Sequence, residues 1–206
     1  MARLLSFSLF ALAVLVVSAA SSAPAPVTGN SPAVAPAGES RATSFVRKTC
    51  DDATYISLCL DTLLPNAARI NLHPKKAARL AIMATISGVQ TAASKLQNQS
   101  KKPKLRAHEV AALNECTTMV MDSVLGLNQA LEETQHLGGG SKSDKQAKRV
   151  SMEEHVSNVV DAANTCVNNM HVVNARDVLL IRVEDVLEPL VELATNAVDL
   201  IHRMQF

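Results

Sequence analysis

Aromatic residues are scarce in this 206-residue sequence, which contains no Trp, one Tyr and four Phe. Because hydrophobic residues still make up 48% of the chain, a core must be packed mainly from aliphatic side chains. Several of these residue types favour helix–helix packing, although Val and Ile alone would also permit strands. The composition therefore favours a globular, helical protein.

Long hydrophobic runs are absent beyond the N-terminus, because charged residues interrupt every later apolar stretch. The exception is Leu4–Val17, which follows Arg3 and precedes small residues. This run is too short to span a membrane comfortably, and its flanks are typical of a signal peptide. We predict a signal peptide over residues 1–23, cleavage near Ala20 or Ala23, and no membrane attachment afterwards.

The segment after the predicted signal peptide, residues 24–39, is rich in Pro, Ala, Ser and Gly. Such a segment buries too little apolar surface to fold. We predict a disordered linker there, followed by a single domain over residues 40–206.

The chain also lacks a large excess of positive or negative charge. Removal of Arg3 lowers the 20 basic residues to 19, which equals the 19 acidic residues. A neutral domain without a basic stripe is not expected to bind nucleic acid. The lysine-rich run from Lys142 to Arg149 is interpreted as a solvated loop.

Four long segments have apolar residues at alternating intervals of three and four, which is the spacing of one helical face. These segments cover residues 74–99, 105–134, 150–171 and 177–204. Pro103 separates the first two, and Gly138–Ser141 separates the next two. Four helices joined by short loops predict an up-and-down four-helix bundle.

Two shorter helical stretches are predicted before the bundle, at about residues 40–49 and 53–64, with Pro65 closing the second. They are too short to form a core alone, so they must pack on the bundle as an arm or extend to a partner. Pro189 lies inside the last long segment. Since the apolar spacing continues beyond it, we predict a bend there and not a helix end.

The chain has four cysteines, Cys50, Cys59, Cys116 and Cys166. An even number behind a signal peptide argues for disulfides, with three possible connectivities. A Cys50–Cys59 bond would staple the short helical pair, and a Cys116–Cys166 bond would join the second and third long helices. No close Cys-x-x-Cys pair or histidine cluster accompanies them, so no metal site is expected.

No catalytic motif is present. Neither Gly-x-Ser-x-Gly nor His-Glu-x-x-His occurs, and the six histidines are scattered. The Gly138–Ser143 stretch lacks the spacing of a phosphate loop and follows a predicted helix where a strand is required. We predict a protein that is not an enzyme and needs no cofactor.

One modification motif occurs, the N-glycosylation sequon Asn98-Gln99-Ser100. It falls at the predicted end of a helix, where a glycan would lie in solvent. Asn98 is therefore a candidate glycosylation site.

Short sequence runs around the four cysteines match those of one known family. The runs are Phe45–Cys50 with Tyr55 and Cys59, Ala112–Cys116 with Asp122–Val124, Asn164–Cys166, and Leu193–Ala197. Together, over about residues 40–204, they resemble the plant invertase and pectin methylesterase inhibitor family. The resemblance implies a four-helix bundle with an N-terminal helical hairpin and the disulfides Cys50–Cys59 and Cys116–Cys166. It also implies reversible binding to a cell-wall enzyme whose substrate cleft the inhibitor covers.

The resemblance favours pectin methylesterase over invertase as the target. Invertase inhibitors of the family carry a Pro-Lys-Phe motif between the third- and fourth-cysteine helices, and the interval Leu137–Arg149 lacks it. Pectin methylesterase inhibitors use polar and acidic side chains on those two helices. The matching positions, our candidate target-binding residues, are Thr118, Asp122, Asp161, Thr165 and Asn168. Thr118 and Asn168 replace acidic residues of the family, whereas the other three keep the residue type.

Two other functions are compatible with the sequence. Inhibition of a cell-wall or vacuolar invertase is the alternative within the family. A helical carrier of a small apolar ligand is the alternative from another class, and it would need a hollow core. Regularly spaced, medium-sized aliphatic residues more often form a filled core. We therefore expect a secreted, extracellular inhibitor that forms a one-to-one complex with pectin methylesterase.

Overall fold

The computed structural model describes residues 40–206, so the predicted signal peptide and linker lie outside the described residues. This part of the chain is helical and contains no strand. Its elements are α1 (Arg41–Cys50), α2 (Ile56–Leu63), η1 (Leu64–Asn66), α3 (Ala67–Ile70), α4 (Pro74–Ser100), α5 (Ala107–Gln135), η2 (His136–Gly138), α6 (Lys142–Val172) and α7 (Asp177–His202).

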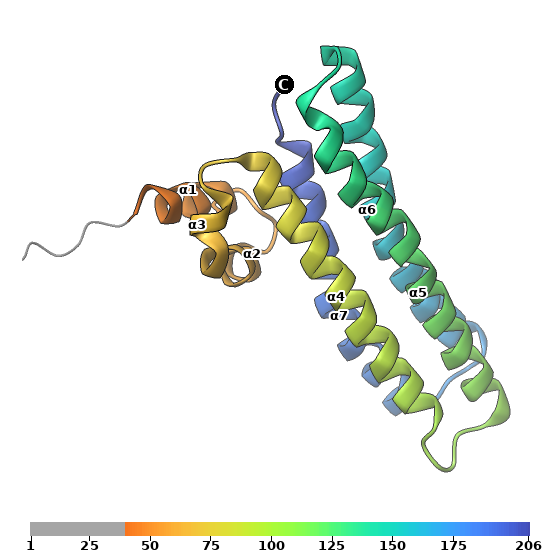
Figure 1. Ribbon diagram of the computed structural model, residues 1–206. Coiled ribbons are helices and arrows are strands. Elements are labelled where there is room, and N and C mark those ends of the chain that lie inside the picture. The colour runs from red at the N-terminus through yellow and green to blue at the C-terminus, as the bar shows by residue number, and fades with distance from the viewer. Residues whose placement is uncertain (1–39) are drawn as a thin grey trace, which may run out of the picture. The chain divides into compact units, whose positions relative to one another are not determined.

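The four long helices form a bundle. Helix α5 packs against α4 and α6, and α7 packs against α6 and α4, which closes the ring (Figure 1). Short connections reverse the chain between successive helices, so the predicted all-α, up-and-down four-helix bundle is confirmed.

The core follows the apolar spacing of the sequence. In α6, for example, the buried residues are Met152, Val156, Val159, Ala163, Cys166 and Met170. They recur every three or four residues, so they lie on one face of the helix. Helix α7 runs through Pro189 without ending there, which agrees with the prediction that the helix continues.

One predicted boundary was wrong. The run from Lys142 to Arg149 is not a loop, because α6 begins at Lys142. Ser141 caps this helix: its Oγ accepts a hydrogen bond from the Asp144 backbone N–H at 3.1 Å, and the Asp144 carboxylate accepts one from the Ser141 N–H at 2.9 Å. This reciprocal capping box starts the helix in a segment that has no apolar face.

The second helix of the arm ends before Pro65, as predicted, because α2 ends at Leu63. Pro65 itself lies in the first turn of η1, where its missing N–H costs no hydrogen bond. The short helix α3 follows and ends at Asn71, which adopts the left-handed conformation with φ 46°. The N-terminal arm therefore comprises α1, α2, η1 and α3.

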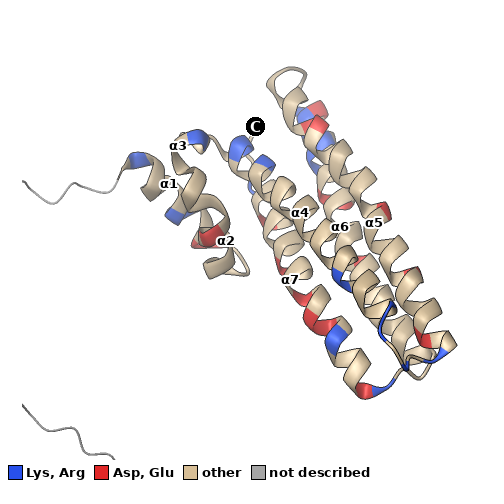
Figure 2. Cartoon of the chain, turned by 60° about the horizontal axis from the view of Figure 1, so that its bottom comes forward, with Lys and Arg blue, Asp and Glu red and all other residues tan. Residues whose placement is uncertain are grey.

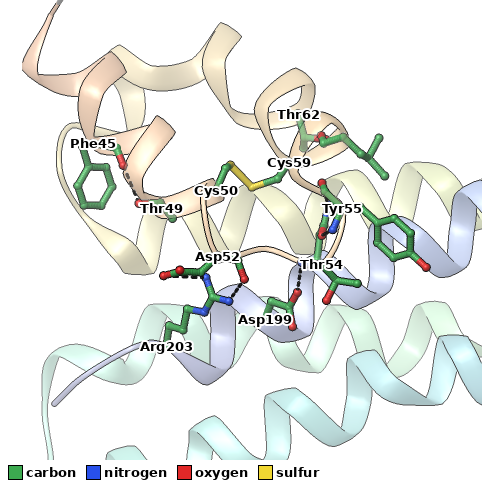
Figure 3. Close-up of a disulfide and its surroundings, with 12 residues drawn as sticks. Phe45, Thr49, Cys50, Asp52, Thr54, Tyr55, Cys59, Thr62, Asp199 and Arg203 are labelled. Atoms are coloured by element: carbon green, nitrogen blue, oxygen red, sulfur yellow. Dashed lines mark hydrogen bonds and ion pairs between the residues drawn. A yellow bond between two sulfur atoms is a disulfide. The ribbon is translucent and has the colours of Figure 1, made fainter.

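The turn between α1 and α2 attaches the arm to α7 (Figure 3). The side chain of the buried Asn196 accepts a hydrogen bond from the Tyr55 N–H and donates one to the Tyr55 carbonyl, both at 2.9 Å. Asp199 accepts a 2.7 Å hydrogen bond from the Thr54 N–H, and Arg203 forms a hydrogen bond and an ion pair with Asp52. These bonds fix the turn because backbone groups there have no partner within a helix.

A buried carboxylate holds the opposite end of the bundle together. Glu109 in the first turn of α5 is fully buried and accepts hydrogen bonds from Arg106 and Arg176 at 2.8–3.1 Å. Arg106 also donates to the Asn174 carbonyl, and Arg176 donates to the Lys104 carbonyl. We call these three side chains the Glu109 clamp, since they join the α4–α5 loop to the α6–α7 loop.

Candidate functional site

A disulfide in the core fixes the two helices that carry the candidate target-binding residues. Cys116 of α5 and Cys166 of α6 are bonded, with Cα atoms 4.9 Å apart, and both residues are fully buried. Cys50 and Cys59 form the second disulfide, with Cα atoms 5.6 Å apart. These are the pairs that the family resemblance implied, and the described residues include no free cysteine.

The seam between α5 and α6 is marked by a hydrogen bond from Ser151 Oγ to Glu133 Oε1 at 2.8 Å. Asp122 precedes Glu133 by about three helical turns, so it lies on the same side of α5. Thr165 follows Ser151 by about four turns, so it lies near the same side of α6. Both residues are exposed, which places them along this seam on the outside of the bundle.

Two further candidates lie farther from the seam. Thr118 of α5 is exposed, and its hydroxyl donates to the Asn114 carbonyl at 3.2 Å. Asp161 of α6 is exposed and precedes Thr165 by about one turn. With Asp122 and Thr165, these residues form what we call the α5–α6 face.

The carboxylates of the α5–α6 face have no internal partner. Neither Asp122 nor Asp161 has a side-chain hydrogen bond or ion pair with any residue in the described part of the chain. An exposed, unpaired carboxylate can accept charge-assisted hydrogen bonds from a partner without first breaking an internal bond. The face is therefore suited to binding a surface that carries hydrogen-bond donors or positive charge.

Asn168 lies about two turns after Asp161, so the two residues point to nearly the same side of α6. Asn168 also lines a groove of about 760 Å³ between α6 and α7, into which Tyr55 of the arm reaches. The α7 side of this groove carries Glu184, Asp185, Glu188 and Glu192. Figure 2 shows the resulting acidic stretch along α7. The apolar spacing of α7 did not predict this acidic side, because that spacing marks only the buried residues of the helix.

Large side chains from all four long helices are fully buried in the core, among them Ile82, Leu113, Met152 and Leu190. A hollow between the arm and the bundle, lined in part by Cys59, Leu63 and Leu193, measures about 10 Å³. A space of that size holds about one water molecule, so it cannot take an organic ligand. This observation disfavours the apolar-ligand carrier.

Residues 40–206 contain no cluster of three or more His, Cys, Asp or Glu side chains that could hold a metal ion. No helix in that range is both long and apolar enough to cross a bilayer. Asn98 is exposed in the last turn of α4, and its glycosylation stays a prediction.

The fold and site define a class of protein: a four-helix bundle with a disulfide-stapled helical arm and an exposed polar face beside its core disulfide. Residues 44–200 match the family model described as plant invertase/pectin methylesterase inhibitor. Because this match spans most of the chain, the protein belongs to the plant invertase/pectin methylesterase inhibitor family.

Two of the three relatives described next carry names that agree with this assignment. Pectinesterase inhibitor 10 of Arabidopsis thaliana is 26% identical over 158 residues, which cover 77% of this chain and 50% of the relative. Pectinesterase inhibitor 3 of the same species is 30% identical over 129 residues, which cover 62% of this chain and 63% of the relative. The 21 kDa protein of Daucus carota is 24% identical over 135 residues, which cover 66% of this chain and 70% of the relative. The chain thus spans only half the length of the first of these relatives.

Two solved structures share the fold. A mutant form of a pectin methylesterase inhibitor from Arabidopsis matches with a TM-score of 0.55 and 17% identity, covering 76% of this chain and 94% of that one. A pectin methylesterase inhibitor from Arabidopsis thaliana matches with a TM-score of 0.51 and 16% identity. This match covers 79% of this chain and 97% of that one. At these identities the likeness establishes the fold alone.

Proposed function

We propose that this protein is secreted and inhibits a pectin methylesterase by binding it reversibly, one to one, so that the α5–α6 face blocks the substrate cleft. The observation that carries the proposal is the pair of unpartnered carboxylates, Asp122 and Asp161, on two helices joined by a buried disulfide. Family membership supports an inhibitory role, and the names of two relatives support this target.

The physical argument rests on rigidity and charge. The Cys116–Cys166 bond holds α5 and α6 together, so the face loses little conformational entropy when it docks. An enzyme that acts on a polymer of uronate esters must accommodate uronate groups in its cleft. Carboxylates on the inhibitor are complementary to such a cleft, and their attraction should weaken as salt screens it.

Invertase is the alternative target. The Pro-Lys-Phe motif of the invertase inhibitors is absent between Leu137 and Arg149, where helix α6 begins instead. No feature of the described residues favours invertase over pectin methylesterase, so we retain the methylesterase as the proposed target.

A pair of enzyme assays tests the proposal. Methanol release from pectin by plant methylesterases, and sucrose hydrolysis by cell-wall and vacuolar invertases, would each be measured with increasing amounts of the protein. We expect the methylesterase rate to fall to a plateau at one equivalent while the protein stays uncleaved. Inhibition of invertase alone would overturn the choice of target.

Secretion is tested separately. Mass mapping of protein collected from the medium of plant cells should find a new N-terminus after Ala20 or Ala23. Retention of the uncleaved leader would contradict this part of the proposal.

A further inference from the structure

One long stretch of the sequence contains no acidic residue. Between Asp61 and Glu109 no acidic residue occurs, whereas nine basic residues do. Glu109 itself is buried within its clamp, so it offers no negative charge to a ligand at the surface. The surface contributed by this stretch is therefore positively charged, although the whole chain is close to neutral.

Four of these basic residues lie together at one end of the bundle. They are Lys95, Lys101, Lys102 and Lys104, which we call the lysine end. All four are exposed, and none forms a side-chain hydrogen bond or ion pair with a described residue. Figure 2 shows basic residues along the connecting loops at this end of the bundle. An exposed acidic residue, Asp177 in the first turn of α7, also lies at this end of the bundle.

The loop that carries three of these lysines is held in place. Lys104 adopts a left-handed conformation with φ 71°, and its carbonyl accepts a 3.2 Å hydrogen bond from Arg176. The Glu109 clamp fixes Arg106 at the end of the same loop. Since the backbone is already ordered, a ligand that binds the lysines does not have to order the loop.

We propose that the lysine end binds de-esterified galacturonan, the polyanion of uronate units that a pectin methylesterase leaves behind. The choice of this polyanion rests on the proposed function. Each exposed Lys–carboxylate contact is weak and screened by salt. A polymer with a carboxylate on every unit engages several lysines at once, so its later contacts form at high effective concentration.

The lysine end is separate from the α5–α6 face. Thr118 lies about 18 Å along the α5 axis from Arg106, at about 1.5 Å per residue. A polymer bound at the end of the bundle therefore leaves the face open to an enzyme. Such binding would concentrate the inhibitor on wall regions where the methylesterase has already acted.

The test compares two variants with matched loss of charge. The first replaces the four residues of the lysine end by Gln. The control replaces Lys75, Lys76, Lys142 and Lys145 by Gln, which removes the same charge elsewhere on the bundle. Titration of each purified protein with polygalacturonate, fully methyl-esterified pectin and duplex DNA would be followed by calorimetry at low and high salt.

We expect the parent and the control to bind polygalacturonate with similar affinity, and the first variant to bind at least tenfold more weakly. Esterified pectin should not bind, and salt should weaken binding to polygalacturonate. Equal binding by both variants, binding of the parent to esterified pectin, or tighter binding to DNA would each overturn the inference. Methanol release measured with the same proteins separates the two proposals. A parent protein that inhibits the enzyme but does not bind polygalacturonate refutes only the lysine end, and a parent that binds polygalacturonate but does not inhibit refutes only the proposed function. Weaker polymer binding by the first variant with unchanged inhibition supports a lysine end that is separate from the α5–α6 face.

Discussion

Glu109 binds one arginine that is close in the sequence and another that is far away in it. Its side chain is buried, yet Arg106 and Arg176 surround it with hydrogen-bond donors. The hydrogen bond from the Arg106 side chain is the largest cause of a pKa for Glu109 far below its ordinary value, against the opposing effect of burial. The carboxylate therefore stays ionised and joins two loops at one end of the bundle.

Replacing Glu109 by Gln should lower the free energy of unfolding at pH 7 by about 2–4 kcal/mol, because ionic hydrogen bonds within a buried pair are lost. The arginines are half exposed and can regain water, which limits the cost. Urea unfolding of Glu109→Gln against Glu115→Gln, an exposed change on the same helix, measures this difference.

The same pair of proteins tests the direction of the pKa shift. Because the folded pKa is lowered, Glu109 stabilises the parent above its unfolded pKa, near 4.3, and this contribution is lost as the pH falls below that value toward the folded pKa. The parent should thus lose stability between about pH 5 and pH 2 more steeply than Glu109→Gln. Parallel pH profiles would show that folding does not lower the pKa of Glu109.

Leu125 is a second residue that sequence reasoning did not single out. It lies about two turns after Thr118 on α5, and 72% of its surface is exposed. An exposed Leu side chain on the α5–α6 face gains free energy when a bound protein removes it from water.

Leu125→Ala should weaken inhibition of the methylesterase about tenfold, since burying a Leu contributes about 1.5–3 kcal/mol. Its effect on unfolding should be within about 0.5 kcal/mol, because the side chain is exposed. Val178→Ala, which truncates an exposed side chain on α7, is the control. Inhibition constants unchanged by Leu125→Ala would exclude Leu125 from the interface.

Among individual residues, the sequence identified candidate binding side chains but not every surface to which they belong. Asp122 and Thr165 could be placed near each other because both have short, known spacings to bonded cysteines. Asn168 has such a spacing too, but the α6–α7 groove that it also lines was not predictable. The distant partner of Glu109 was not predictable either, because Arg176 is 67 residues away along the chain.

At the scale of elements, apolar spacing predicted the four long helices and their order. It failed where a helix has no buried side: residues 142–149 are charged and polar, so the start of α6 depends on the Ser141–Asp144 capping box. It also did not predict α3 after Pro65, because a proline is compatible with the first turn of a new helix as well as with the end of an old one.

The two disulfides should contribute unequally to stability. Cys116–Cys166 closes a loop of 50 residues and joins two core helices, whereas Cys50–Cys59 closes one of 9 residues. The chain-entropy model gives roughly 4.1 and roughly 2.7 kcal/mol, respectively. Thermal melting of Cys116→Ser/Cys166→Ser should therefore occur at a lower temperature than that of Cys50→Ser/Cys59→Ser. Equal melting temperatures, or the reverse order, would contradict this ranking.

At the scale of the whole molecule, charge is segregated although the total is close to zero. Helix α4 carries basic residues and no acidic ones, whereas α7 carries an acidic row along its groove with α6. Such segregation suits a protein that meets more than one charged partner, because each surface attracts a different sign. The net charge of the chain does not reveal this segregation, because only the fold shows which charged residues share a surface.

We propose that the α5–α6 face binds a pectin methylesterase, and the inhibition constant for methanol release tests this most directly. It would be measured with the parent, with Asp122→Asn/Asp161→Asn, and with Asp51→Asn/Asp61→Asn. The last variant removes two exposed carboxylates from the N-terminal arm, which packs against α4 and α7. We predict at least a tenfold weaker inhibition, about 1.4 kcal/mol, for the face variant and less than a twofold change for the control. Equal inhibition by both variants, or no inhibition of any methylesterase by the parent, would contradict the claim.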